Sequence, residues 1–124
     1  MKATHLLGFF VGLVLLAACE KSEPPTPTPS GPPDAARGKE AIARYQCMAC
    51  HEIPGVEGPR CGAGPSLAGF ASRPKIAGTA ENTHSNLVQW IINPHSLKPA
   101  TLMPSLNVSA TDAEDIAAYL ETLK

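Results

Sequence analysis

The sequence has few aromatic residues, and this shortage limits how large a core the chain can build. Three phenylalanines, two tyrosines and one tryptophan make up 5% of its 124 residues. Four of these six lie in the part that we expect to fold: Tyr45, Phe70, Trp90 and Tyr119. A domain of about 90 residues buries too little surface by itself to be robust. We therefore expect that something other than side chains completes its core.

The chain also lacks an excess of positive or negative charge. It has ten basic and eleven acidic residues, which give a net charge of −1. Nothing in this balance indicates binding to nucleic acid. The charge is unevenly distributed, because residues 60–98 hold four basic residues and one acidic residue, whereas residues 99–124 hold one basic and four acidic. This asymmetry is either an ordinary solvated surface or a molecular dipole that orients the domain on a partner.

No apolar run is long enough to span a membrane comfortably. The longest extends over 13 residues, from Leu6 to Ala18, whereas a spanning helix needs about 20. After the basic Lys2, this length is typical of a signal peptide. The run ends Leu16-Ala17-Ala18-Cys19, which resembles the lipobox of bacterial lipoproteins. The resemblance implies a signal peptide over residues 1–18 and lipidation of Cys19; the alternative is an ordinary signal peptide that ends near a cysteine.

Residues 19–33 lack any large apolar residue, and residues 20–33 contain six prolines. Such a segment cannot form a packed core. Proline stiffens it toward polyproline II, so that it reaches roughly 43 Å. We interpret it as a tether between the lipidated Cys19 and a single folded domain over residues 34–124. This organisation predicts a lipid-anchored protein of the bacterial periplasm or the outer face of the cytoplasmic membrane.

The clearest motif is Cys47-Met48-Ala49-Cys50-His51. Two thiols three residues apart, followed by an imidazole, form the attachment pattern of a c-type haem. Cys47 and Cys50 can each bond one vinyl group, and His51 then becomes the proximal iron ligand. Thiol–disulfide exchange would require a βαβ context, and a zinc site would require a second closely spaced pair of ligands; neither is present. One covalent haem c is therefore the expected cofactor, and it would supply the missing core.

Cys61 is left without an assigned role, because lipid would take Cys19 and haem would take the motif cysteines. One interpretation is a partly buried, unreactive side chain. The other is an intermolecular disulfide or a redox function.

Apolar periodicity predicts an all-α domain with three main helices and long loops wrapped around the haem. We expect helices over about 35–46 and 85–92, and a third that starts after Ser109. Residues that can cap them are Asp34, Thr83 or Ser85, and Ser109. Residues 52–80 are rich in glycine and proline and show no helix or strand period. Leu67, Phe70 and Ile76 are the expected inward residues of this loop.

The expected second iron ligand is Met103, which lies in an irregular stretch between two helices beside Pro104. His95 and then His84 are the alternatives, and both are otherwise interpreted as exposed residues at helix ends. Met48 lies inside the motif, too close to the proximal side to reach across the haem. Ligation by His51 and Met103 would leave no open iron position.

Together these features resemble a class I cytochrome c over residues 34–124. The matching elements are the first helix, Cys47 to His51, Gly64 to Leu67, the helix with Trp90 ending at Asn93-Pro94, Thr101 to Pro104, and the last helix with Tyr119. The resemblance implies that the Pro65 carbonyl accepts a hydrogen bond from His51, and that Arg73 faces a haem propionate. It further implies that Trp90 and Thr101 line the haem. Gly38 departs from the pattern by about one position, which leaves the pairing at the helix crossing open.

With His51 and Met103 both bound, the iron has no open position for a substrate. This favours outer-sphere electron transfer over catalysis at the iron, so we do not expect an enzyme. The expected role is a membrane-tethered electron carrier of a bacterial respiratory chain. Its donor would be a quinol-oxidising complex or a dehydrogenase, and its acceptor a terminal oxidase or reductase. One alternative is a fixed electron-entry subunit of a larger oxidoreductase or oxidase. A haem-based gas sensor is the second, and it would require a displaceable Met103.

Overall fold

The computed structural model describes residues 31–59 and 61–124. The predicted signal peptide, Cys19 and most of the tether lie outside the described residues, so these assignments stay predictions. Within the described part of the chain, no helix is both long and apolar enough to cross a bilayer.

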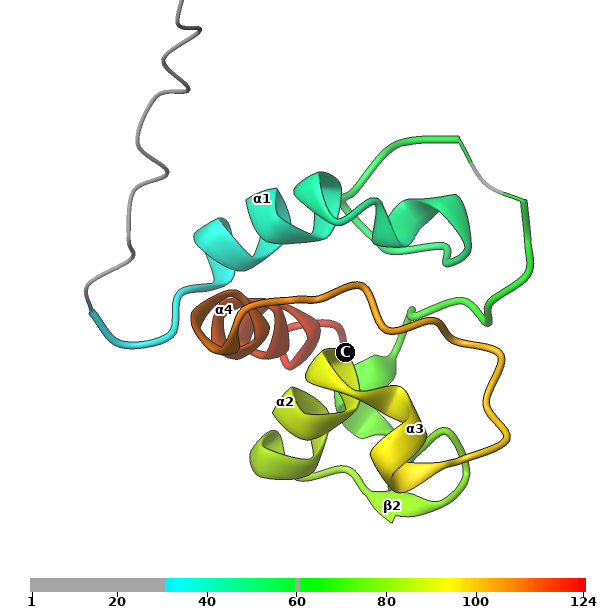
Figure 1. Cartoon of the computed structure of the whole chain (residues 1–124). Helices are drawn as coiled ribbons and strands as arrows, with labels where there is room; N and C mark the ends of the chain where they lie inside the picture. The colour runs from blue at the N-terminus through cyan, green and yellow to red at the C-terminus, as the bar shows by residue number, and fades with distance from the viewer. Residues whose placement is uncertain (1–30, 60) are drawn as a thin grey trace, which may run out of the picture.

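The described residues form a mostly helical domain (Figure 1). Its elements are α1 (Ala35–Arg44), a 3-10 turn (Cys47–Ala49), a second 3-10 turn (Phe70–Ser72), β1 (Lys75–Ile76), β2 (Ala80–Glu81), α2 (His84–Ile92), α3 (Pro94–Leu97) and α4 (Ala110–Leu120). The all-α prediction and its three main helices are confirmed. The long loop expected over residues 52–80 is interrupted by one 3-10 turn and by β1, which pairs in antiparallel fashion with β2 at the end of the loop. Each of these elements is too short to produce a detectable hydrophobic period in the sequence.

The three main helices begin where the capping residues predict. The side-chain oxygens of Asp34, Thr83 and Ser109 accept hydrogen bonds from the amide three residues further on, at 2.9, 3.3 and 3.1 Å. Each bond satisfies one of the free amides at a helix start. Pro94 ends α2 as expected, but it also occupies the first position of the unpredicted helix α3, where a missing amide hydrogen costs nothing.

Helices α1 and α4 cross in close contact at Gly38 (Figure 1). A Cβ atom at this position would lie 2.0 Å from the Asp115 carbonyl oxygen and 3.0 Å from Cβ of Tyr119. The backbones of α1 and α4 therefore approach closely at Gly38, and the crossing pairs Gly38 with Asp115. The Asp115 carboxylate is buried and accepts two hydrogen bonds from the Arg37 guanidinium, at 2.8 Å each. These bonds hold the pKa of Asp115 below its usual value and fasten α1 to α4.

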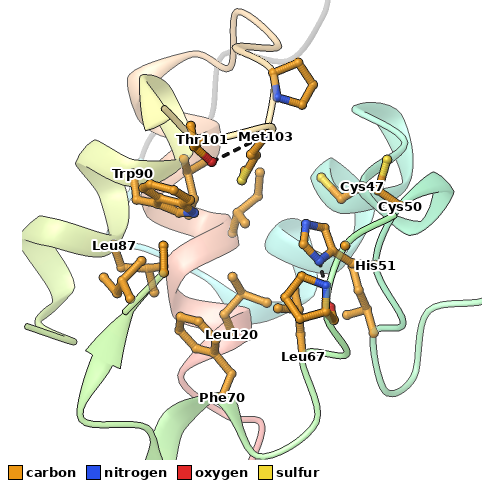
Figure 2. Close-up of a pocket in the computed structure, with 18 of the residues that line it drawn as sticks. Cys47, Cys50, His51, Leu67, Phe70, Leu87, Trp90, Thr101, Met103 and Leu120 are labelled. Atoms are coloured by element: carbon orange, nitrogen blue, oxygen red, sulfur yellow. Dashed lines mark hydrogen bonds between the residues drawn. The ribbon is translucent and has the colours of Figure 1, made fainter. Parts of the chain in front are cut away.

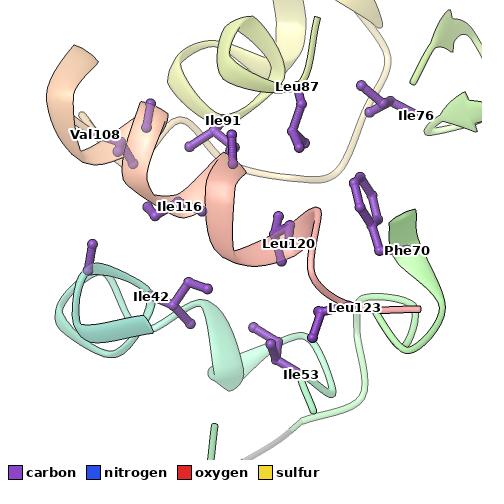
Figure 3. Close-up of a cluster of buried hydrophobic side chains, with 13 residues drawn as sticks. Ile42, Ile53, Phe70, Ile76, Leu87, Ile91, Val108, Ile116, Leu120 and Leu123 are labelled. Carbon is purple, nitrogen blue, oxygen red and sulfur yellow. The ribbon is translucent and has the colours of Figure 1, made fainter. Parts of the chain in front are cut away.

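The buried apolar side chains form one cluster in which α4 is the central element (Figure 3). Its larger members are Ile42, Ile53, Phe70, Ile76, Leu87, Ile91, Val108, Ile116, Leu120 and Leu123. Phe70 and Ile76 are buried as predicted for the long loop, and Leu67 packs against the cluster at partial burial. The cluster therefore joins segments that are far apart in the sequence.

His84, the first residue of α2, ties this helix to α4. Its Nε2 lies 2.7 Å from Oε2 of Glu114, and its Nδ1 lies 3.0 Å from Oε1 of Glu121. Carboxylates only accept hydrogen bonds, so both contacts together need the doubly protonated ring. These hydrogen bonds to Glu114 and Glu121 raise the pKa of His84 above its ordinary value.

We expect replacement of His84 by glutamine to alter how stability depends on pH. The folded pKa exceeds the unfolded one, so the contribution of His84 is fully present below the unfolded value of about 6.5 and is lost as pH rises through the folded value. The replacement should lower the free energy of unfolding at low pH by at most about 1 kcal/mol, because the ion pairs of His84 are partly exposed. Thermal unfolding at several pH values would measure it, with His95→Gln as the matched control. Identical pH profiles for the unaltered protein and His84→Gln would contradict it.

Candidate functional site

A cavity of about 600 Å³ opens in the domain beside the motif cysteines (Figure 2). Its walls come from the Cys47–His51 motif, the loop of residues 63–77, helices α2 and α4, and the segment of residues 98–104. Within the described part of the chain, Arg73 and Lys98 are the only Lys, Arg, Asp or Glu residues in the lining. The cavity therefore suits a largely apolar molecule.

The three chemically reactive motif residues lie together on one wall. Gln46 adopts a left-handed conformation with φ of 56° that ends α1, and the 3-10 turn follows directly. The amides of Cys50 and His51 both donate to the Cys47 carbonyl, at 3.3 and 3.1 Å. This turn places both half-buried thiols and the imidazole in the lining. Burial raises the pKa of the Cys47 thiol above its usual value.

Pro65 and Gly64 fix the orientation of the His51 ring. Nδ1 of His51 lies 2.8 Å from the Pro65 carbonyl oxygen. A carbonyl can only accept, so Nδ1 carries the proton and Nε2 keeps its lone pair for a metal. This is the contact that the resemblance implied for Pro65. A Cβ atom on Gly64 would lie 2.5 Å from Cε1 of His51, so any side chain there would displace the ring.

The sequence analysis assigned no role to Gly64, although Gly64 is the first residue of the segment Gly64 to Leu67 that resembles the family. One sequence signal was available, namely a glycine directly before the expected acceptor Pro65. Glycine is common in such loops, and only the ring placed against it shows why a side chain is excluded.

Met103 faces the same cavity from another segment of the chain (Figure 2). Its amide donates to Oγ1 of Thr101 at 3.2 Å, and the Thr101 amide donates to the Lys98 carbonyl at 3.0 Å. These bonds hold the methionine backbone at the wall. Met103 is partly buried, and its sulfur and the His51 ring both point into the space between them.

The alternative ligands lie elsewhere. His84 and His95 are exposed at the starts of α2 and α3, as interpreted from the sequence, and neither belongs to the cavity lining. Met48 is buried close to Gly58, where a Cβ atom would lie 2.4 Å from Cγ of Met48. Met48 is also absent from the lining. The arrangement thus favours Met103, whose role as iron ligand stays a prediction.

Trp90, Thr101 and Arg73 all lie in the cavity lining, which is compatible with the haem contacts that the resemblance implied for them. Arg73 donates from one terminal nitrogen to the carbonyls of Ser66 and Ala68, at 2.6 and 2.9 Å, and its guanidinium lies 5.6 Å from the Phe70 ring centre. These contacts hold a cation at the cavity. Its predicted contact with a propionate is compatible with this position and stays a prediction.

Cys61 is exposed, so the expectation of a partly buried side chain is wrong. Its amide donates to the Ala49 carbonyl at 2.8 Å, which holds it beside the motif. A hydrogen bond with the Cys61 thiol raises the pKa of the Cys50 thiol. Cys61 itself is absent from the cavity lining.

The donor set fits an iron porphyrin better than a bare metal ion. An imidazole and a thioether face one apolar cavity, and two thiols lie at its edge. These are the axial and covalent partners of haem c. Across residues 31–59 and 61–124, no cluster of three or more His, Cys, Asp or Glu residues could hold a metal ion alone.

Comparison with known proteins agrees with this fit. The family model described as Cytochrome c matches residues 35–124. Cytochrome c-552 of Bradyrhizobium diazoefficiens is 31% identical over 91 residues, which cover 73% of this chain and 76% of that protein.

Two further relatives are named cytochrome c oxidase subunit 2. The protein of Alkalihalophilus pseudofirmus is 38% identical over 91 residues, covering 73% of this chain and 26% of that protein. The protein of Bacillus subtilis is 32% identical over 89 residues, which cover 68% of this chain and 24% of that protein. The chain thus spans about a quarter of these oxidase subunits.

The family match covers the whole domain that holds the cavity. It agrees with the helical fold, with the Cys47–His51 motif and with an apolar cavity that both expected axial residues face. The chain therefore belongs to the cytochrome c family as a class I c-type cytochrome, with one covalently bound haem c.

Proposed function

We propose that this protein is a membrane-tethered electron carrier of a bacterial respiratory chain. When bound, haem c supplies an iron that accepts and releases one electron. The observation that carries the proposal is that His51 and Met103 face one cavity from two segments of the chain. With both side chains bound there, substrates would have no open iron position.

The residues around the cavity favour a site that changes little between its two redox states. The Pro65 carbonyl and the absence of a side chain at Gly64 fix the His51 ring, and Thr101 holds the Met103 backbone. A soft thioether favours the reduced iron, and the apolar walls disfavour the additional charge of the oxidised site. Both effects act to raise the reduction potential. The lipid on Cys19 would raise the local concentration of membrane partners within reach of the proline-rich tether.

A redox titration of the purified full-length protein, combined with exposure of the reduced form to carbon monoxide, tests this proposal. We expect one haem per chain, one reversible one-electron transition and no binding of carbon monoxide at neutral pH. Binding of carbon monoxide by the unaltered protein would instead support a gas sensor and refute the carrier.

A fixed electron-entry subunit is the second candidate, and the likeness to oxidase subunits favours it. Isolation from membranes in mild detergent distinguishes the two. A mobile carrier should separate from any oxidase, whereas a fixed subunit should elute with it at constant stoichiometry. Retention in membranes should also be lost in Cys19→Ser, if lipidation of Cys19 is the anchor.

A further inference from the structure

Cys61 lies beside one of the two cysteines that attach the haem. Its amide donates a hydrogen bond to the Ala49 carbonyl at 2.8 Å, and the Gly64 amide donates to the Cys50 carbonyl at 3.0 Å. The Cys50 and Cys61 thiols are themselves in hydrogen-bond contact. The chain that follows Cys61 therefore runs directly alongside the motif and brings a third thiol to it.

The three thiols differ in their surroundings. Cys47 is half-buried and packs against the apolar core, whereas Cys61 is exposed. Cys50 is half-buried and lies next to Cys61. Disulfide exchange requires a thiol that the disulfide of an oxidant can reach. Cys61 is thus the thiol that an external oxidant meets first, and Cys50 is the thiol placed to react with the product.

The contact between Cys50 and Cys61 is local in the chain. The two residues are 11 positions apart, so closing the loop between them costs little chain entropy. A disulfide needs Cα atoms roughly 4.4–6.8 Å apart, which is the spacing of chain segments that are hydrogen-bonded side by side. The amide bonds of Cys61 and Gly64 create this arrangement. Pairing therefore needs neither the helices nor the completed core, and it is open to the chain before haem is bound.

We propose that Cys50 and Cys61 form a disulfide in the haem-free chain, and that haem can attach to Cys50 only after this disulfide is reduced. Cys61 attacks the disulfide of an oxidant, either a protein disulfide or glutathione disulfide, and one thiol leaves. Cys50 then attacks the mixed disulfide, and the second thiol leaves with the second proton. The two cysteines are oxidised and the oxidant is reduced to two thiols. A dithiol reductant reverses the exchange.

This pairing ends when haem is attached. The S–H group of reduced Cys50 adds across a vinyl group, which consumes the thiol without net transfer of electrons. Cys61 then stays as a free, exposed thiol. In an oxidising compartment the disulfide would protect the Cys50 sulfur from irreversible oxidation until haem arrives. The proposal concerns maturation of the protein, so it does not depend on the proposed function as an electron carrier.

The test maps disulfides in the haem-free, full-length chain, which carries Cys19→Ser so that only three cysteines remain. The chain is oxidised with glutathione disulfide, alkylated, and cleaved with trypsin after Arg60. A disulfide between Cys47 and Cys50 stays within one peptide, whereas a bond to Cys61 joins two peptides that mass spectrometry identifies. We expect the joined peptides to be the main product.

Cys47→Ser and Cys50→Ser are the matched pair of variants. In a chain without local structure, loop closure would favour Cys50 over Cys47 as the partner of Cys61 by only about 1.4-fold. We expect at least about fivefold more cross-link to Cys61 in Cys47→Ser than in Cys50→Ser, the factor that one hydrogen bond typically contributes. Yields no more different than loop closure predicts would overturn the proposal. A main product that joins Cys47 to Cys50 in the three-cysteine chain would overturn it as well.

A second measurement tests whether the disulfide blocks haem attachment. Its background is Cys19→Ser with Cys47→Ser, in which Cys50 can pair only with Cys61. Haem content is compared with and without Cys61→Ser in a host that attaches haem but lacks its dithiol reductant. Adding Cys61→Ser should raise haem content at least about twofold, because exchange then no longer holds Cys50 as a disulfide. With the reductant restored, the two chains should load equally. Equal haem content without the reductant would refute the block.

Discussion

Replacement of Met103 by alanine is expected to convert the iron from a closed centre to one with an open position. Met103 faces His51 across the cavity, and its backbone is held by Thr101, so alanine removes the sulfur without releasing the segment. The reduced variant should bind carbon monoxide, and the oxidised variant should lose the weak charge-transfer band of methionine-ligated ferric haem. Its potential should fall by on the order of 0.2 V, within the range of about 0.8 V that axial ligands span.

Met48→Leu is the matched control for this variant. Met48 is the methionine within the motif, but it is buried near Gly58 and absent from the cavity lining. Leucine preserves its apolar volume, so the spectrum and the potential should stay near those of the unaltered protein. Persistence of the charge-transfer band in Met103→Ala would refute the ligand assignment. In that case the same measurement should be made on His95→Gln and His84→Gln, the two alternatives from the sequence.

Without haem, the domain is expected to be largely unfolded. Its cavity measures about 600 Å³ and is lined by core residues such as Leu87, Ile116 and Leu120. At roughly 24 cal/mol per Å³, a dry hollow of this size would cost on the order of 14 kcal/mol. Whole domains are stable by about 5–15 kcal/mol. The domain can avoid this cost by admitting water, which leaves the apolar lining unburied, or by collapsing, which would disturb the contacts between α2 and α4.

The double variant Cys47→Ser, Cys50→Ser tests this expectation, because it removes both covalent attachments. Far-UV circular dichroism should show loss of most helical signal, and urea should produce no cooperative transition. Cys61→Ser is the matched control: Cys61 is exposed and outside the cavity lining, so its variant should keep haem and fold. A native-like helical spectrum for haem-free protein would show that side chains alone complete the core.

The sequence predicted the helix starts, because a helix start is determined by residues that are neighbours in the chain. The capping residues Asp34, Thr83 and Ser109 marked three helix starts, because a side-chain oxygen and an amide three residues away are neighbours in the chain. The hairpin β1–β2 and helix α3 were missed, because two or four residues carry too little periodicity. Cys61 was expected to be partly buried, but its exposure depends on how the long loop folds back.

The contacts between distant segments required the folded structure. The sequence left the partner of Gly38 at the helix crossing open, and only the crossing of α1 and α4 identifies the Asp115 carbonyl as its neighbour. In the same way, no sequence pattern joins His84 to Glu114 and Glu121. These contacts depend on the relative position of two helices, which is set by the shared core rather than by local preference.

The sequence by itself determined the chemistry of haem attachment, because Cys47, Cys50 and His51 lie within five consecutive residues and their spacing specifies the reaction. Only the tertiary structure decided which side chains face the His51 ring, since Met103 lies 52 residues further along the chain. The physical reason is that attachment needs one turn of backbone, whereas a cavity needs several distant segments packed around one core.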